Sequence, residues 1–183
     1  EAYYRKRLEN LEFNVSCYTN VTPEHINIHG TFENYIECKK ELFRRTKKDG
    51  YCILNIDEEY YEEMRNACNG NIYTYGKNIN ATLQIVEYKV FPYKTLITWK
   101  YKDELYEVES PLLGDFNVYN LSAGMLICLA LGFDINSLIK NIKNITISGR
   151  LELLKTDTPY YVMVDYAHTP NGIKNLLNFV HTL

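Results

Sequence analysis

The chain has 183 residues, of which 46% are apolar and 23% charged, and its formal net charge is −3. This apolar content, with 17 tyrosines and 7 phenylalanines, excludes an intrinsically disordered chain and predicts a well-packed core. A sequence pI near 5.9 gives no overall positive field, which disfavours nucleic-acid binding. No apolar run reaches the length of a membrane span, and the first residues do not resemble a signal peptide, so we expect neither.

The cysteines are odd in number, scattered, and never spaced as C-x-x-C. Such a set favours free thiols in a reducing cytoplasm over a disulfide or zinc framework. The chain begins without Met on what reads as a helix, so we expect it to be a piece of a longer protein. The cysteines are Cys17, Cys38, Cys52, Cys68 and Cys128.

The first part of the chain predicts alternating strands and helices, the order of a parallel sheet with crossover helices. Thr31 can cap the first helix, and Asp49-Gly50 can end it. In chain order, the expected elements are strand 13–19, a helix from Thr31 to about Lys48, strand 51–56, helix 58–68 and strand 72–75.

From residue 81 to about 111 the apolar period changes to two, which predicts an antiparallel patch with a hairpin at residues 102–104. The fold class is therefore α/β, with a mainly parallel sheet and an added antiparallel patch. A second, incomplete domain is expected after a hinge at residues 148–150, because one strand pair and one helix cannot close a core. The later expected elements are a buried helix at 117–131, an amphipathic helix capped by Asp134, strands 151–154 and 160–164, and a helix that Thr169-Pro170 begins.

Lys39 is the most informative single residue. It falls on the same helical stripe as Phe32, Tyr35 and Ile36, whereas Lys40 points outward. A lysine on a core-facing stripe must snorkel, pair, or lose its charge. Snorkelling is the ordinary outcome. The alternative is a partly neutral amine that is open to chemical modification.

Polar residues follow several of the predicted strands. His25 and His29 come after the first strand and could share a metal, although stabilising a turn is their ordinary role. The acidic run 57–59 is read as a solvated helix start. Asp165 and His168 precede a helix N-terminus, a natural place for phosphate or ribose contacts.

Two asparagines, Asn117 and Asn120, flank the start of the buried helix, and capping explains one of them but not both. With these residues in view, four stretches in sequence order resemble the motifs of Mur ligases and together extend over nearly the whole chain. Pro23 and Asn27 stand where the family more often has Arg and Asp, and Ser148 where it has Pro. The stretches are 19–39, similar to T-N-[LV]-[TS]-x-[DE]-H-x-x-x-H-G-[TS]-x-E-x-Y-x-x-x-K; 114–120, similar to G-x-F-N-x-x-N; 148–152, similar to P-G-R-x-E; and 164–170, identical to V-D-Y-A-H-T-P.

The resemblance implies a P-loop-type central, ATP-binding domain over residues 1–148, truncated at its N-terminus. It also implies the beginning of a Rossmann-like C-terminal domain over residues 149–183. We expect the phosphate-binding loop and a uridine-binding domain before Glu1, and a D-N-P-R-type motif after Leu183. The chain by itself is therefore expected to be inactive.

The resemblance also implies site residues. Lys39 would be carbamylated on Nζ and, with His25, would hold Mg²⁺ near the γ-phosphate of ATP; oxygen anions suit that ion. The remaining implied roles are adenine binding by Asn117 and Asn120, contacts to ribose and phosphate by Arg150 and Asp165 with His168 beside them, and contact of Arg7 with the UDP-muramoyl-peptide.

The implied reaction is ATP-dependent addition of a diamino acid to UDP-MurNAc-L-Ala-D-Glu through an acyl phosphate, in peptidoglycan precursor synthesis. The last motif is that of the family member that adds the third amino acid. We expect a cytoplasmic monomer that uses ATP and Mg²⁺. Another Mur-type amide ligase, such as a cyanophycin-synthetase-like enzyme, and a non-catalytic degenerate chain remain the alternatives.

Overall fold

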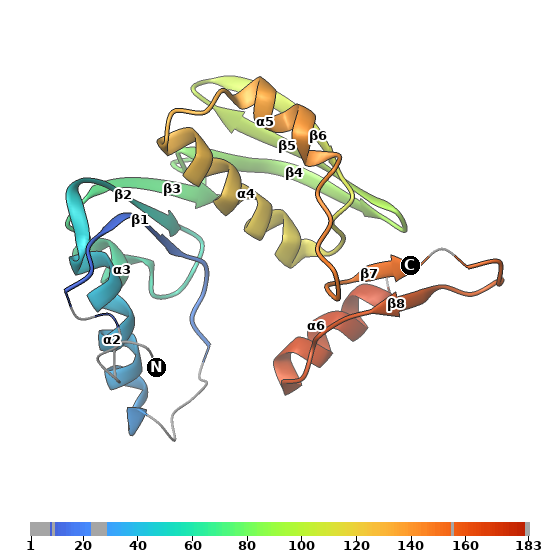
Figure 1. Ribbon diagram of the computed structural model, residues 1–183, viewed down its shortest axis with the longest axis horizontal. Helices are drawn as coiled ribbons and strands as arrows, with labels where there is room; N and C mark the ends of the chain where they lie inside the picture. Colours follow the sequence, from blue (N-terminus) through green and yellow to red (C-terminus); the bar gives the residue numbers. More distant parts are fainter. Residues whose placement is uncertain (1–7, 9, 23–28, 155, 182–183) are drawn as a thin grey trace.

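The computed structural model describes residues 8, 10–22, 29–154 and 156–181 (Figure 1). These residues form a six-stranded sheet in the order β1-β2-β3-β4-β5-β6 and a separate two-stranded sheet, β7-β8. Strands β1 to β4 pair in parallel, and β4 then pairs antiparallel with β5, as β5 does with β6. The expected α/β fold class is therefore confirmed.

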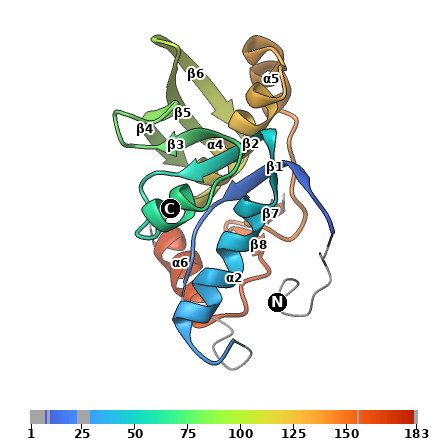
Figure 2. The same ribbon diagram turned by 90° about the vertical axis from the view of Figure 1, so that its left-hand side faces the viewer.

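The parallel half follows the predicted order. Because successive residues of a strand point to opposite faces, Ile53 packs into one core and Cys52 and Leu54 into another. The sheet thus has a helical layer on each face (Figure 2). The elements are β1 (Phe13–Tyr18), α2 (Phe32–Arg44), β2 (Thr46–Asn55), α3 (Tyr61–Asn66) and β3 (Asn71–Gly76).

Helix α2 is shorter than predicted. Thr31 caps it as expected, accepting a hydrogen bond from the Asn34 amide at 3.2 Å, but the helix ends at Arg44 and β2 starts at Thr46. Asp49 and Gly50 therefore lie inside a strand and do not break a helix. A Cβ on Gly50 would lie 2.6 Å from the Asn14 carbonyl oxygen, so glycine is needed there because β1 passes so closely.

The antiparallel half contains the predicted hairpin. Lys102 and Asp103 connect its last two strands with φ values of 50° and 65°, and positive φ at both central residues is typical of a two-residue hairpin turn. The elements are β4 (Leu83–Phe91), β5 (Lys94–Tyr101) and β6 (Glu104–Ser110).

Strand β4 joins the two halves of the sheet. It pairs with β3 at two positions, Tyr75 with Leu83 and Gly76 with Gln84. Just before this junction, Thr74 and Thr82 exchange two hydrogen bonds, each backbone N–H donating to the other residue's hydroxyl at 3.0–3.1 Å. These two side chains thus lengthen the short hydrogen-bonded contact between β3 and β4.

Helix α4 (Asp115–Ala130) is the buried helix that the sequence predicted. It packs against β2, β3 and β4, and its buried residues lie on several of its faces. Helix α5 (Ile135–Ile142) follows, and the Asp134 carboxylate caps it by accepting from the Ser137 amide at 2.8 Å. Both helices belong to the larger of the two main cores.

The C-terminal unit consists of β7 (Glu152–Leu154), β8 (Val162–Val164) and α6 (Pro170–Val180). Thr169 caps α6 as predicted, accepting from the Gly172 amide at 3.2 Å. A small cluster of Leu113, Leu151 and Phe179 packs this unit against the segment before α4. Among the described residues, no helix is long and apolar enough to cross a membrane.

Candidate functional site

A pocket of about 480 Å³ opens at the carboxyl ends of the parallel strands. This edge is where open α/β sheets place their ligands. Its wall combines hydrogen-bonding side chains with aromatic rings, which suits a planar polar ligand. The pocket is lined by Thr19, Asn20, Asn55, Asp57, Glu58, Tyr75, Phe116, Tyr119 and Asn120.

The two predicted asparagines at the start of α4 differ in what they can contact. Asn117 is 3% exposed and donates its amide N–H to the Leu113 carbonyl at 2.8 Å. Asn120 is exposed, lines the pocket, and donates to the Asn117 side-chain oxygen at 3.4 Å. Asn117 therefore supports the helix start and orients Asn120, which is the one that reaches the pocket.

Asp57 is the residue whose role the sequence reading missed. The sequence predicts a solvated helix start at residues 57–59, yet the Asp57 carboxylate joins three segments. It accepts from the backbone amides of Lys77 and Asn78, at 2.5 and 3.1 Å, and from the Tyr119 hydroxyl at 3.0 Å. The available signal was its place directly after a buried strand, next to a predicted ligand edge.

A second polar link ties Asp57 to the first strand. The side-chain oxygen of Asn55 accepts from the Asp57 amide at 3.2 Å, and its amide nitrogen donates to the Thr19 carbonyl at 3.0 Å. The pocket floor is therefore fixed by hydrogen bonds that connect β1, β2 and the turn after β3.

Burial controls ionisation in this pocket. It raises the pKa of the Glu58 carboxyl, and the neighbouring charges of Asp57 and Glu59 raise it further. Burial also raises the pKa of the Tyr75 and Tyr119 hydroxyls, so both stay protonated and act as hydrogen-bond donors at neutral pH. The pocket thus presents acidic and amide groups without a fixed positive charge from its own lining residues.

Lys39 lies on α2 and is half-buried, so it is neither enclosed in the core nor fully extended into solvent. Its Nζ stands 4.9 Å from the centre of the Tyr35 ring. This contact, one helical turn away, agrees with the predicted stripe.

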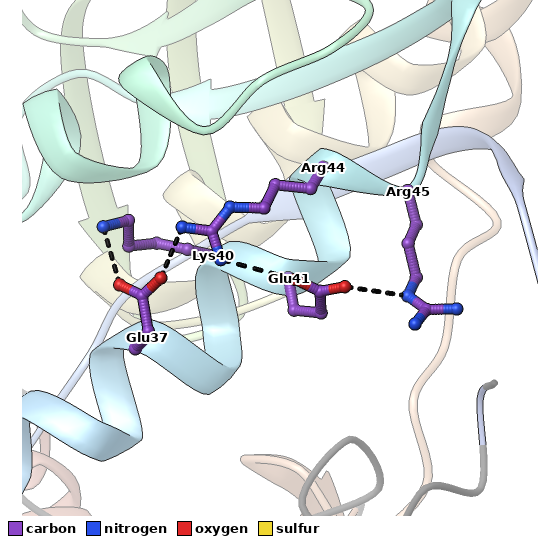
Figure 3. Close-up of polar contacts among 5 residues, drawn as sticks. All are labelled: Glu37, Lys40, Glu41, Arg44 and Arg45. Carbon is purple, nitrogen blue, oxygen red and sulfur yellow. Dashed lines mark hydrogen bonds and ion pairs between the residues drawn. The ribbon is translucent and has the colours of Figure 1, made fainter.

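The neighbouring charges on α2 are held by a ladder of ion pairs (Figure 3). Lys40 binds Glu37 at 2.8 Å, Arg44 binds Glu37 and Glu41, and Arg45 binds Glu41 at 3.1 Å. The Lys40 amine is therefore used in a surface pair, as its outward position predicted. Lys39 is not a member of this ladder.

The structure brings Arg150, Asp165 and His168 together beside the C-terminal unit. The Arg150 guanidinium lies 4.8 Å from the centre of the Tyr166 ring, and that ring lies 4.8 Å from the His168 ring. The Asp165 carboxylate accepts from the amides of Leu151 and Ala167, at 2.8 and 2.7 Å. It therefore ties together the two loops that carry Arg150 and His168.

The remaining predicted residues divide between described and undescribed segments. His25 and Arg7 lie outside the described residues. His29 is 3% exposed, and its ring lies 5.1 Å from the Tyr35 ring. The described candidates thus occupy three places: α2, the start of α4, and the loops around Arg150, with α2 at the lower left and the C-terminal unit at the lower right of Figure 1.

Residues 1–128 match the family model described as the Mur ligase middle domain. The chain is 31% identical over 180 residues to a UDP-N-acetylmuramoyl-L-alanyl-D-glutamate–2,6-diaminopimelate ligase of Caldanaerobacter subterraneus subsp. tengcongensis, covering 93% of the chain and 35% of the relative. It is 33% identical over 189 residues to the corresponding L-lysine ligase of Staphylococcus aureus, covering 95% and 36%. The chain therefore spans about a third of the length of these curated relatives.

Solved structures agree with the fold. A UDP-N-acetylmuramoyl-L-alanyl-D-glutamate–2,6-diaminopimelate ligase superposes with a TM-score of 0.83 at 27% identity, covering 98% of this chain and 38% of that one. A MurF ligase of Thermotoga maritima in complex with ADP gives a TM-score of 0.80 at 18% identity, covering 96% and 40%. At that identity the second likeness concerns the fold alone.

Proposed function

The chain belongs to the Mur ligase family, and we propose that the protein of which it forms a part adds a diamino acid to UDP-MurNAc-L-Ala-D-Glu at the expense of ATP. The observation that carries this proposal is similarity over nearly the whole chain to ligases named for that dipeptide substrate. Relatives named for diaminopimelate and relatives named for lysine match about equally well. The proposal therefore names the class of the added substrate, a diamino acid, and not one member of that class.

We assign residues 1–148 to the central domain and residues 149–183 to the start of a C-terminal domain. The hinge between them is supported by two residues with positive φ, Gly149 at 68° and Leu151 at 45°. The Glu152 carboxylate accepts from the Gly149 amide at 2.7 Å, and Asp165 accepts from the Leu151 amide. The two carboxylates thus hold a short, conformationally unusual connection.

The pocket at the carboxyl edge fits the base of a nucleotide. A purine presents ring nitrogens and an exocyclic amine that amide side chains can recognise, and its faces suit aromatic contacts. Asn120 offers both a donor and an acceptor at the rim, while Phe116 and Tyr119 supply apolar surface. We propose that Asn120 contacts the base and that Asn117 holds Asn120 in place.

Lys39 and His25 are proposed to hold Mg²⁺, with Lys39 carbamylated. The half-buried Lys39 amine lies against an aromatic ring and outside the ion-pair ladder of α2, which fits an amine free to react with CO₂. The carbamate would offer the anionic oxygens that Mg²⁺ prefers. The bound ion would neutralise the negative charge that gathers around the phosphates.

In the proposed reaction the D-Glu carboxylate is phosphorylated and the amine of the incoming diamino acid then displaces phosphate. The chain's contribution is to position and to balance charge, because phosphoryl transfer needs little covalent help from a protein. Arg150 supplies the cation of the C-terminal cluster, with Asp165 and His168 proposed beside the ribose. Arg7 is proposed to contact the UDP-linked substrate.

The decisive experiment uses the full-length protein. Purified enzyme, UDP-MurNAc-L-Ala-D-Glu, ATP and either lysine or meso-diaminopimelate should yield ADP and a tripeptide product with one of the amines. ADP release that depends on neither amine would contradict the proposal. The isolated 183-residue chain is expected to be inactive.

Lys39→Ala tests the modification, with Lys40→Ala as its matched control one residue away. After equilibration with carbon-13 bicarbonate, the wild type and Lys40→Ala should show a carbamate carbonyl signal by NMR, and Lys39→Ala should not. We expect Lys39→Ala to lower kcat by about 10²-fold or more, the size of effect typical of losing a charge-stabilising group. A carbamate signal that persists in Lys39→Ala would contradict the assignment.

We propose a cytoplasmic location and a monomer. The described cysteines are all unpaired, as is usual in a reducing compartment. The proposed reaction also consumes ATP, which fits the proposed cytoplasmic location. Gel filtration with light scattering on the full-length enzyme tests the monomer, and a dimer mass would contradict it.

A further inference from the structure

Asp57 occupies the point where three segments of the nucleotide edge meet. It follows β2, its carboxylate accepts from both amides at the start of the turn after β3, and it accepts from Tyr119 on α4. A carboxylate has no donor of its own when ionised, so three donors aimed at it form a matched set. None of these partners is close to Asp57 in sequence: they lie 20, 21 and 62 positions away.

The backbone next to Asp57 is shaped for this close approach. Gly76 has a φ of 148°, and a Cβ placed on it would lie 2.6 Å from Oδ2 of Asp57 and 2.9 Å from Oδ1. Any side chain larger than hydrogen at residue 76 would displace the carboxylate. The Asp57 contacts therefore depend on a glycine that leaves room for them.

Tyr119 transmits this arrangement to the pocket. Its ring forms part of the pocket wall, together with Phe116 one turn earlier and Asn120 one residue later. Its hydroxyl donates to Oδ2 of Asp57, the oxygen that also accepts from the Lys77 amide. That bond holds the tip of the side chain, so without it the ring could leave the wall through a change of its χ1 rotamer.

We propose that Asp57 is a positioning residue of the nucleotide pocket, and that it acts through Tyr119 to fix the wall against which the base of ATP binds. This inference rests on the proposed function, because it takes the ligand of this pocket to be a nucleotide. Asp57 itself contacts no reacting atom. Its effect is on affinity for the nucleotide and not on the chemical step.

If the bond between Tyr119 and Asp57 served only to hold α4 in place, its loss would lower the melting temperature. Helix α4 is anchored by fully or nearly fully buried apolar side chains, including Val118 at 1% exposure and Leu126 at 0%. Asp57 is exposed and belongs to neither core. Removing the Tyr119 hydroxyl should therefore leave the helix in place and change the pocket wall.

The test is Tyr119→Phe in the full-length enzyme, with Tyr106→Phe as the control. Tyr106 donates the same kind of bond, to the Glu104 carboxylate at 2.6 Å, but on the edge strand β6 and outside the pocket lining. We expect Tyr119→Phe to raise the calorimetric Kd for ATP and the KM for ATP about tenfold, which corresponds to about 1.4 kcal/mol of binding free energy lost when the pocket wall is no longer held in its binding position. The kcat, the KM for the dipeptide substrate and the melting temperature should stay near those of the wild type, and Tyr106→Phe should change none of these values.

Asp57→Ala, which removes the acceptor, and the double variant identify the partner. If Tyr119 acts through Asp57, adding Tyr119→Phe to Asp57→Ala should weaken ATP binding no further, so the two effects are not additive. Unchanged ATP affinity in Tyr119→Phe, or additive effects in the double variant, would overturn the inference and leave the proposed function intact. Failure of the wild-type enzyme to bind ATP would overturn both.

Discussion

Trp99 on β5 donates a hydrogen bond from its indole Nε1 to the Ser122 hydroxyl on α4 at 2.9 Å, and both side chains are completely buried. The same hydroxyl donates to the Val118 carbonyl at 2.8 Å. One small side chain thus satisfies the indole N–H of the chain's single tryptophan, deep in the interface between the antiparallel strands and α4.

Ser122→Ala should destabilise the protein, because it leaves the indole N–H without an acceptor in a dry core. An unsatisfied buried donor costs about 1–3 kcal/mol, which exceeds the few tenths gained from the better helix propensity of alanine. Urea unfolding of the full-length protein, followed by circular dichroism, measures the difference. Adding Trp99→Phe should remove the penalty of the unpaired donor, so the two substitutions should not be additive. Full additivity would contradict this account.

Gly76→Ala and Gly124→Ala should change stability in opposite directions. An alanine at residue 76 would need a φ of 148° and would collide with the Asp57 carboxylate, so we expect a loss of about 1–3 kcal/mol and weaker ATP binding. Gly124 lies within α4, and a Cβ there meets nothing within 4 Å, so alanine should stabilise by about 0.5–1 kcal/mol. Thermal unfolding compares the pair. Equal effects would show that the space around Gly76 is unimportant.

Asp134 should make the stability of α5 depend on pH. Hydrogen bonds from Ser137 lower the pKa of the Asp134 carboxyl below its usual 3.8, so the folded state favours the charged form. The stabilisation is therefore present above the unfolded pKa and is lost as the pH falls through the lower folded value. Asp134→Asn keeps a side chain that can cap a helix but cannot titrate.

The measurement for Asp134 is the melting temperature of the wild type and of Asp134→Asn at neutral and acidic pH. The advantage of the wild type should shrink at about pH 3 relative to pH 7. Asp134→Ala, which cannot cap, should be less stable than Asp134→Asn at both values. A wild-type advantage that is constant with pH would contradict the assignment.

Asp165→Asn should loosen the hinge. The carboxylate accepts the Leu151 and Ala167 amides on its two oxygens, whereas an asparagine offers one acceptor and turns a donor toward the other amide. Leu151 has a φ of 45°, a conformation that a leucine keeps only when its surroundings impose it. Limited proteolysis should cut at residues 148–151 faster in Asp165→Asn than in the wild type. The control variant Asp157→Asn, at an exposed position of the β7–β8 hairpin, should be cut at the wild-type rate.

Local patterns predicted most of the elements. Period-two alternation located the antiparallel patch with its hairpin at residues 102–104. The caps at Thr31, Asp134 and Thr169 are all confirmed, because each depends on residues within three positions of the cap. The predicted end of α2, at about Lys48, was wrong, because the helix ends at Arg44. The chain extends into β2 at Thr46 because β1 pairs with β2 there and again from Tyr51, and no local pattern contains these contacts across 30 or more positions.

The candidate site was only partly accessible to sequence reasoning. The stripe on α2 correctly placed Lys39 beside Tyr35, but burial by neighbouring segments decides how deep such a side chain lies, and it is half-buried. The sequence predicts only a solvated acid at Asp57, because the partners of its carboxylate come from two distant segments. The roles of His25 and Arg7 stay predictions.

The two-position pairing of β3 with β4 has a mechanical consequence. A sheet whose halves share so few backbone bonds does not transmit distortion well across that line, so the nucleotide edge and the antiparallel hairpins are coupled chiefly by α4, which packs on strands from both sides. Local opening should then occur in two cooperative blocks, with amide exchange in β5 and β6 independent of exchange in β1 and β2 until α4 itself unfolds.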